Sequence, residues 1–309
     1  MRTTFLRTLE ELAAGDERVM LLTGDLGYTV VEPFADRFPG RFVNVGVAEQ
    51  NMVALATGLA EAGFIPFVYS IITFAVLRPY EFIRNGPVLH RLPVRIVGVG
   101  GGFEYGHGGP THHGLEDVAV TRAQPGLEVV APADYRQARS ALLATWDLPG
   151  PVFYRLGKDD RLTIPGLEGR FERGRAHLVR GGGDLLMVAM GSVAHEAVVA
   201  AEALAEEGLS VAVMVVSSLN PAPVEDLAAA LGRHRQVLTV EAHYKVGGVG
   251  SLVSEVAAER ALACRVVRCA VGESPDGVSG GQGFLRHRHG LSAAALAEKA
   301  RRTLSEAGG

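Results

Sequence analysis

The sequence contains little cysteine and no long hydrophobic run. Its two cysteines, Cys264 and Cys269, lie in the short segment CRVVRC, where their odd spacing points them to opposite faces of a strand. That spacing favours neither a disulfide nor a shared metal ion. No apolar run approaches the ~20 residues that a membrane-spanning helix needs, and residues 1–19 lack the apolar core and cleavage site of a signal peptide. We therefore expect a cytoplasmic protein.

A large excess of charge of one sign is also missing. The chain has 30 Lys and Arg against 34 Asp and Glu, a formal net charge of -4, and these charges are spread along its length. Nucleic-acid and membrane-surface proteins carry basic clusters, so we expect neither kind of partner. Lysine is scarce whereas arginine, alanine and glycine are abundant, which is typical of a high-GC bacterial gene.

The 309 residues are enough for about two domains of ~150 residues each. Short β-branched runs alternate with helical patterns up to residue 156, and the alternation restarts near residue 184. This order predicts an α/β protein with two domains, each a mainly parallel sheet flanked by helices. We place the first domain at 1–162, a linker at 163–175 and the second domain at 176–309.

The common nucleotide-binding motifs are absent. The turn GVGGG at 98–102 is followed by phenylalanine where G-x-G-x-x-G needs its last glycine, and no P-loop pattern occurs. The loop EYGHGGPTHHGLED, residues 104–117, follows at the carboxyl end of a predicted strand, where parallel sheets place ligand sites. Its histidines, His107, His112 and His113, lack zinc-type spacing, so we predict no metal ligands in this chain. We expect them to contact a polar substrate, with a solvated loop of incidental histidines as the alternative.

Glu49 occupies an unusual position in RFVNVGVAEQNMVALATGLAEAG, residues 41–63. It lies where an apolar strand pattern passes into a helix rich in alanine, valine and leucine. The simplest interpretation is a carboxylate at a helix N-terminus, which the helix dipole stabilises by ~0.3–1 kcal/mol. The apolar flanks predict burial, however, and a buried carboxylate needs a partner or stays protonated. Such a group is suited to sharing a proton with a ring nitrogen.

Several segments resemble the carboxyl-terminal half of transketolases. They are GDLGYTV, VGVAEQNMVALATGLA, GGPTHHGLEDVAVTRAQPGLEVVAPAD and VLTVEAHYKVGGVGSLVSE, and the likeness extends from about Arg2 to the last helix. The resemblance implies a pyrimidine-binding domain of a thiamine diphosphate enzyme, followed by a transketolase C-terminal domain. It also implies transfer of a two-carbon ketol unit from a ketose or ketose phosphate to an aldehyde.

The resemblance implies which residues contact the cofactor. Glu49 falls on the catalytic glutamate that hydrogen-bonds the aminopyrimidine ring nitrogen and sets its tautomer, while thiamine diphosphate performs the carbanion chemistry. Asp25 matches an aspartate beside the cofactor. The phenylalanine that stacks on the aminopyrimidine falls near Ile72, with Phe74 and Tyr69 as nearby aromatic candidates.

The resemblance also implies substrate contacts. His112 matches a histidine near the reacting carbons. Arg2, Thr29 and Lys158 fall where the sugar phosphate binds, although lysine lacks the bidentate fork of the family's arginine. His243, in the second domain, also matches the family, and we expect it to be structural.

Two departures bear on the substrate. Gly100 stands where family members carry a histidine, and His107 and Gly108 replace the acidic pair of a GEDGP segment. In that family, the aspartate of this pair contacts a hydroxyl group of the acceptor. We therefore expect a substrate different from the common sugar phosphates.

One cofactor-binding motif is missing. Thiamine diphosphate enzymes hold the diphosphate through Mg²⁺ with a GDG motif, and no GDG occurs in the chain. Because Met1 already lies at the start of the pyrimidine-domain pattern, we expect a separate subunit, matching the amino-terminal half of transketolases, to supply the diphosphate and Mg²⁺ site. The chain alone is then inactive, and the family's paired pyrimidine domains imply an α2β2 heterotetramer.

Two alternatives remain open. Beta subunits of 2-oxoacid dehydrogenases and the matching half of 1-deoxyxylulose-5-phosphate synthase share the layout and the cofactor but catalyse other reactions. A non-catalytic interaction subunit that kept the fold is the second alternative, and the retention of Glu49 and GPTHH argues against it. Activity with a ketose phosphate, as opposed to pyruvate, separates the catalytic hypotheses.

Overall fold

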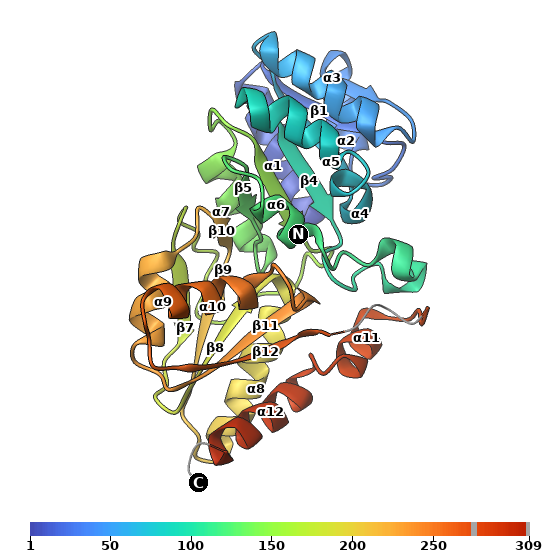
Figure 1. The fold of residues 1–309 in the computed structure, drawn as a ribbon. Coiled ribbons are helices and arrows are strands. Elements are labelled where there is room, and N and C mark those ends of the chain that lie inside the picture. Colours follow the sequence, from blue (N-terminus) through green and yellow to red (C-terminus); the bar gives the residue numbers. More distant parts are fainter. Residues whose placement is uncertain (273–276, 307–309) are drawn as a thin grey trace.

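The computed structural model describes residues 1–272 and 277–306, which form two α/β units stacked on each other in Figure 1. In this described part, the first unit contains a seven-stranded sheet in the order β10-β5-β6-β4-β3-β1-β2. Neighbouring strands are parallel except for β10, which is antiparallel to β5. The strands are β1 (Val19–Thr23), β2 (Phe42–Asn44), β3 (Ile65–Ile71), β4 (Arg95–Val99), β5 (Glu128–Val130), β6 (Val152–Leu156) and β10 (Ser218–Asn220).

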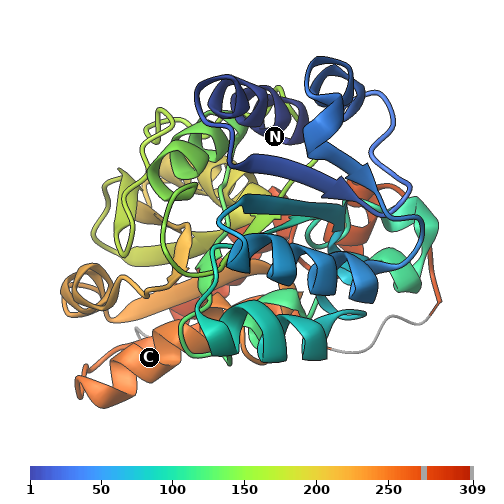
Figure 2. The ribbon, with the colours of Figure 1, turned by 90° about the horizontal axis from the view of Figure 1, so that it is seen from above.

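Helices cover both faces of this sheet, because successive strand residues point to opposite sides. Val19 and Leu21 join the core under the first and last helices of the unit, whereas Met20 and Leu22 join the core on the other face. Figure 2 shows α1 and α3 on these opposite faces. The helices are α1 (Arg2–Gly15), α2 (Glu32–Arg37), α3 (Glu49–Glu61), α4 (Ile72–Val76), α5 (Tyr80–Ile83), α6 (Asp117–Arg122) and α7 (Tyr135–Thr145), with the short turns η1 (Pro39–Arg41), η2 (Arg84–Val88), η3 (Gly106–Gly108) and η4 (Pro110–His112).

The second unit is a smaller sheet in the order β12-β11-β8-β9-β7, also between two layers of helices. It is parallel except for β7, which pairs antiparallel with β9. Its elements are β7 (Ala176–Arg180), β8 (Leu185–Met190), η5 (Gly191–Val193), α8 (Ala194–Glu206), β9 (Val211–Val216), α9 (Val224–Leu231), β11 (Gln236–Tyr244), α10 (Val249–Glu259), β12 (Arg265–Val271), α11 (Gln282–Arg288) and α12 (Ala293–Ser305). The architecture confirms the expected α/β fold of two mainly parallel sheets.

The two units are joined by a shared strand and a shared apolar core. β10 follows β9 of the second unit along the chain, yet it completes the first sheet, with Ser218 opposite Val130. The Asn220 side chain adds a hydrogen bond to the Leu127 carbonyl at 2.7 Å. One continuous apolar core also runs from below α3 to below α9 and α10. The units therefore form one packed body.

The expected linker contributes to this packing. Residues 163–175 contain no helix or strand, but Ile164 and Leu167 are buried in the core of the second unit. The Ile164 amide donates to the Asp134 carboxylate at 2.9 Å. Both cysteines are free thiols, Cys264 half-buried and Cys269 buried.

The parallel order of the first sheet positions the candidate site. β1, β3, β4 and β6 are neighbours and all run in one direction, so the segments after Thr23, Ile71, Val99 and Leu156 meet at one edge. Ligand sites of parallel sheets lie at this carboxyl edge. Within the described ranges, no helix has both the length and the apolar character needed to cross a membrane.

Candidate functional site

Glu49 is the first residue of α3, and its carboxylate lies against the carboxyl ends of β1 and β3. The turn before it contains Gly46 at φ +73, a conformation that favours glycine. The Glu49 residue is only 1% exposed. Its Oε1 accepts a hydrogen bond from the Ser70 hydroxyl at 3.4 Å, and its Oε2 pairs with Nη1 of Arg78 at 2.8 Å. The buried carboxylate thus has a cationic partner.

Arg78 connects this carboxylate to two aromatic rings. It lies between α4 and α5, and its Cζ is 4.0 Å from the centroid of the Phe74 ring. The His112 ring meets Phe74 edge-on, with the two centroids 5.2 Å apart. A guanidinium over an aromatic face is attracted by the negative face of the ring. Glu49, Arg78, Phe74 and His112 therefore form one contiguous group, the Glu49 cluster.

The loop after β4 presents His112 because its two ends are pinned together. Gly102 and Gly114 exchange backbone hydrogen bonds at 2.8 and 3.0 Å. Inside the loop, a Cβ on Gly108 would lie 2.8 Å from the His112 ring, so glycine leaves room for the imidazole. Nδ1 of His112 is 2.9 Å from the Thr111 hydroxyl. The glycines of the loop thus set the position of its histidine.

The other two loop histidines lie apart from the Glu49 cluster. His107 is exposed and approaches Gly281 of the second unit. His113 is 2% exposed, its ring packs edge-on against Phe103 at 5.2 Å, and burial lowers its pKa. Its Nδ1 has no hydrogen-bond partner among the described residues. His113 is an interior residue behind the loop, and a substrate contact by either histidine stays a prediction.

Arg2 and Lys158 both lie near Tyr105 at the same edge. Nζ of Lys158 is 4.1 Å from the Tyr105 ring centroid. Burial raises the pKa of Tyr105, and the nearby charge of Arg2 offsets part of that rise. A Cβ on Gly100 would lie 2.1 Å from Cδ2 of Tyr105. Tyr105 therefore fills the space beside Gly100, the position where the resemblance led us to expect a histidine. Burial and the charge of Arg2 lower the pKa of Lys158.

Asp25 and Thr29 lie in the loop after β1. Oδ1 of Asp25 accepts hydrogen bonds from the Tyr28 hydroxyl and from Nδ2 of Asn44, both at 3.1 Å. Asp25 follows Gly24, on which a Cβ would lie 3.4 Å from Oε1 of Glu49. This arrangement brings Asp25 close to the Glu49 cluster. Thr29 is exposed, and its amide donates to the Glu32 carboxylate at 2.8 Å.

The three residues expected near the position that stacks on the aminopyrimidine differ in how exposed they are. Ile72 is fully buried, because its side chain fills the space left by Gly98 and Gly114. Tyr69 is also buried, at 1% exposed. Phe74 is half-buried and turns one face toward Arg78. Among these three residues, Phe74 alone presents a ring face to the arginine that pairs with Glu49.

Arg155 ties the loop to both units. This β6 residue is 5% exposed and its Nε pairs with Oδ2 of Asp117 at 2.8 Å. Its Nη2 also donates to the carbonyls of Gly114, in the loop, and Ala242, on β11, both at 3.0 Å. One buried guanidinium thus joins a strand of the first sheet, the end of the loop and a strand of the second sheet.

The second unit holds the start of the loop as well. The Ser192 hydroxyl donates to Oε1 of Glu104 at 2.7 Å, and Nη2 of Arg286 donates to Ser192 at 2.9 Å. Oε2 of Glu104 accepts a hydrogen bond from the Lys158 amide. Glu104 therefore couples the second unit to the residue predicted to bind the sugar phosphate.

Sequence reasoning missed Arg78, Tyr105 and Arg155. Arg78 is 29 positions from Glu49, and no local spacing links the two. A signal for Arg155 was present, because a charge inside the apolar run PVFYRL of a central strand needs a buried partner. Tyr105 stands as an aromatic residue in a glycine-rich loop, which by itself indicates no partner.

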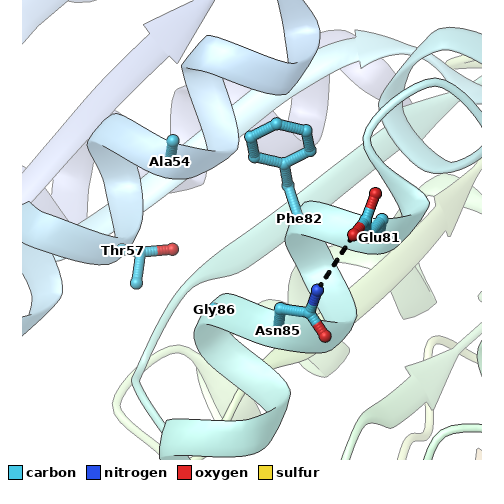
Figure 3. Close-up of a pocket in the computed structure, with 6 residues that line it drawn as sticks. All are labelled: Ala54, Thr57, Glu81, Phe82, Asn85 and Gly86. Atoms are coloured by element: carbon cyan, nitrogen blue, oxygen red, sulfur yellow. Dashed lines mark hydrogen bonds between the residues drawn. The ribbon is translucent and has the colours of Figure 1, made fainter.

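A surface cavity of about 360 Å³ lies between α3 and the α5–η2 segment, lined by Ala54, Thr57, Glu81, Phe82, Asn85 and Gly86 (Figure 3). Asn85 also lines a neighbouring cavity together with Leu89. Phe82 is 40% exposed and Leu89 is 69% exposed. We call the surface formed by Ala54, Phe82, Asn85 and Leu89 the α3–α5 face. No site residue named above lines either cavity.

Residues 1–272 and 277–306 contain no group of three or more His, Cys, Asp or Glu side chains arranged to hold a metal ion. Three carboxylates at the carboxyl edge, those of Glu49, Asp25 and Glu104, each bond a different partner.

Two family models match the chain. The model of the transketolase pyrimidine binding domain matches residues 1–161, and the model of the transketolase C-terminal domain matches residues 174–296.

Individual relatives agree with these matches. The chain is 35% identical to a subunit of the apulose-4-phosphate transketolase of Phocaeicola vulgatus, covering 86% of this chain and 86% of the relative. It is 38% identical to 1-deoxy-D-xylulose-5-phosphate synthase of Syntrophotalea carbinolica, covering 96% of this chain but 47% of the relative. A solved structure described as a split gene transketolase, inactive beta4 tetramer, has a TM-score of 0.89 and 33% identity, covering 98% of each chain.

Proposed function

The chain belongs to the transketolase family, and we propose that it is the catalytic subunit of a split transketolase that uses thiamine diphosphate. The observation that carries the proposal is that one guanidinium, that of Arg78, touches both the buried Glu49 carboxylate and the ring face of Phe74. A carboxylate and an aromatic face that one planar group can contact together suit an aminopyrimidine ring, which offers a basic nitrogen and a flat surface. Both groups lie at the sheet edge where α/β proteins bind ligands.

Each residue of the site then has a role in binding or proton transfer. Glu49 shares a proton with the ring nitrogen, Phe74 stacks on the ring and Asp25 lies beside the cofactor. His112 contacts the substrate near its reacting carbons. When bound, the cofactor supplies the carbanion chemistry, and the protein supplies orientation and proton control.

The anionic end of the substrate is assigned to the cations at the same edge. Arg2 and Lys158 lie around Tyr105, so a phosphate or another anion has two positive charges and a phenol within reach. We propose a phosphorylated ketose as donor. We also assign Thr29 and the exposed His107 to this substrate-binding region. Tyr105 fills the space beside Gly100, where family members carry a histidine, and its hydroxyl takes the place of that imidazole as a polar group toward the substrate.

We propose that a second polypeptide, matching the amino-terminal half of transketolases, completes the enzyme in an α2β2 assembly. The missing GDG motif supports this, because the diphosphate and Mg²⁺ ligands then come from the partner. The relative from Phocaeicola vulgatus is itself named as one subunit of a transketolase, and a related split-gene chain is described as inactive in a beta4 tetramer. The exposed apolar α3–α5 face is proposed to contact the second copy of this chain.

The decisive experiment combines the two polypeptides and measures ketol transfer with thiamine diphosphate, Mg²⁺ and a ketose phosphate. We expect turnover only with both chains, and we expect Glu49→Gln to lower turnover by about two to four orders of magnitude, the size of a general acid–base contribution. Circular dichroism and the thermal midpoint of the variant should stay close to wild type. Near-normal turnover by Glu49→Gln contradicts the assigned role.

A second function has one observation in its favour, the 38% identity to a 1-deoxy-D-xylulose-5-phosphate synthase over 96% of this chain. That enzyme type shares the cofactor but uses pyruvate. The same two-chain mixture should therefore be supplied with pyruvate and an aldehyde. Carbon dioxide release from pyruvate, without transfer from ketose phosphates, selects this alternative. Turnover by the partner alone, unchanged by adding this chain, selects a non-catalytic subunit.

A further inference from the structure

The guanidinium of Arg78 touches both groups that we assign to the aminopyrimidine ring. Its Nη1 is 2.8 Å from Oε2 of Glu49, and its Cζ is 4.0 Å from the Phe74 ring centroid. A guanidinium is planar, carries a positive charge and donates hydrogen bonds within its plane. A ring that shares its proton with Glu49 while stacking on Phe74 has the same three properties. Arg78 therefore makes, within this chain, the contacts that the ring would make.

The remaining surface of the Glu49 carboxylate is enclosed. Oε1 is 3.4 Å from the Ser70 hydroxyl, and a Cβ on Gly24 would lie 3.4 Å from the same oxygen. The Glu49 side chain is 1% exposed, whereas that of Arg78 is 40% exposed. The accessible approach to the carboxylate is therefore the side that Arg78 covers. A ring nitrogen and the guanidinium compete for this side.

Arg78 is weakly held compared with the buried arginines of the chain. Among the described residues, its hydrogen bonding is limited to Glu49, and it lies between α4 and α5 rather than within a helix. Arg95, by contrast, donates to three carbonyls, and Arg155 bonds one carboxylate and two carbonyls. The Arg78 side chain is free to turn outward once another group neutralises Glu49.

We propose that Arg78 is a positioning residue that holds Glu49 and covers Phe74 in the unloaded subunit, and that the aminopyrimidine ring of thiamine diphosphate displaces it. This inference rests on the proposed cofactor contact of Glu49. Because the arginine must leave before the ring enters, its contacts reduce the apparent affinity for the cofactor. Without Arg78, the buried carboxylate keeps only the Ser70 hydroxyl and has no cationic partner until the cofactor arrives, so removal of the arginine favours the loaded state.

The test titrates the two-chain enzyme with thiamine diphosphate in the presence of Mg²⁺ and measures the dissociation constant by calorimetry. We expect Arg78→Ala to lower the Kd about 3- to 30-fold. Arg78→Gln should lower it less, because its amide retains one hydrogen bond to Glu49. The thermal midpoint of the isolated chain should fall in Arg78→Ala, since its buried Glu49 carboxylate loses its cation.

A matched control exists on α2. Arg37 pairs with Glu10 at 2.8 Å and lies over the Phe38 ring at 5.2 Å, an arginine, glutamate and phenylalanine arrangement like that of Arg78. This set involves none of the residues of the Glu49 cluster. Arg37→Ala should leave the Kd for thiamine diphosphate at the wild-type value. If Arg37→Ala lowers the Kd as Arg78→Ala does, the cause is the loss of a surface charge, and the inference is overturned.

The outcomes separate this inference from the proposed function. A Kd that is unchanged or higher in Arg78→Ala overturns the displacement, while losses of turnover in Glu49→Gln would still support the cofactor contact. Unchanged Kd and turnover in Glu49→Gln would overturn the proposed function itself. If Arg78→Ala does not fold, the Glu49→Gln/Arg78→Ala variant has no unpaired buried charge. Its Kd must then be lower than that of Glu49→Gln.

Discussion

At the residue scale, His243 and Glu241 of β11 form a buried pair whose two pKa values shift in opposite directions. The neutral His243 ring donates from Nδ1 to the Tyr244 carbonyl at 2.7 Å and accepts at Nε2 from the Ala119 amide at 3.3 Å. Burial lowers the pKa of His243 to about 4 and raises the pKa of Glu241 to about 7. A neutral, fully bonded imidazole at a junction of the two units agrees with the structural role expected for His243.

The pair makes a prediction about acid stability. Between pH 6.5 and 4 the unfolded chain protonates His243 while the folded chain does not, so acidification should lower the free energy of unfolding. Glu241 opposes this, because its folded form takes up a proton earlier than its unfolded form. In Glu241→Gln the histidine effect should emerge as a loss of about 3 kcal/mol from pH 7 to pH 4. Urea unfolding across this pH range measures it.

The double variant Glu241→Gln/His243→Asn provides the reference for that measurement. It keeps the other titrating groups, so the difference between the two pH profiles belongs to His243. Parallel profiles would show that the folded imidazole titrates normally and would contradict its burial as a neutral ring.

The sequence predicted the burial of Glu49 but not the residues that contact it. The apolar flanks of Glu49 predicted its burial and the need for a partner or a proton, because that inference depends only on neighbouring residues. The identity of the partner, Arg78, depends on how α4 and α5 pack at the end of β3, which is tertiary information. The filling of the space beside Gly100 by Tyr105 has the same origin.

At the scale of elements, the loop at 100–117 is positioned by contacts from outside itself. Arg155 on β6 bonds Asp117 and Gly114 at one end of the loop and Ala242 on β11. The Tyr244 amide donates to the Leu115 carbonyl at 2.7 Å. The second sheet therefore sets the position of a loop that carries residues of the first unit's site.

We predict that Arg155→Ala destabilises the chain by about 3–5 kcal/mol, because it leaves the buried Asp117 carboxylate without its cation. Denaturant unfolding measures the loss. Arg301→Ala is the control, since it removes an exposed arginine paired with Glu207 at 2.7 Å and should leave the unfolding midpoint nearly unchanged. Equal midpoints for the two variants would contradict the coupling through Arg155.

Most elements could be predicted from the sequence, and the exceptions have a common cause. Strands β1 to β6 coincide with β-branched runs, and the fully buried β1, β4 and β6 require continuous apolar sequence. β10 has three residues and pairs antiparallel with β5, so its assignment depends on a distant partner rather than on its own pattern. β7 is likewise an antiparallel strand without fully buried residues.

At the scale of the whole molecule, part of the exposed apolar surface lies next to the helix that carries Glu49. The α3–α5 face includes Phe82 and Leu89, at 40% and 69% exposed, and α3 itself begins with Glu49. A contact made by this face therefore lies one helix away from the proposed cofactor contact. In the proposed assembly, α3 would therefore connect the subunit contact to the proposed cofactor contact.

We predict that Phe82→Asp weakens self-association of the chain and assembly of the two-chain enzyme, because it places a charge in an apolar contact. Sedimentation velocity should show a shift to smaller species, with a loss of at least about tenfold in apparent affinity. Leu178→Asp, on an exposed position of β7 at 51% exposed, is the control and should sediment as wild type. A Phe82→Asp chain that assembles normally would assign the contact to another surface.

The crossing of β10 from one unit into the sheet of the other has a consequence for how such chains evolve. Because Ser218 and Asn220 complete the edge of a sheet that other segments build, the two units cannot be exchanged separately between relatives without exposing that edge. Recombination within the chain should therefore be tolerated poorly between residues 130 and 220. Inheritance of the whole chain as one module preserves the pairing of β10 with β5. Chimeras of two relatives joined outside residues 130–220 should give a higher soluble yield than chimeras joined inside that interval.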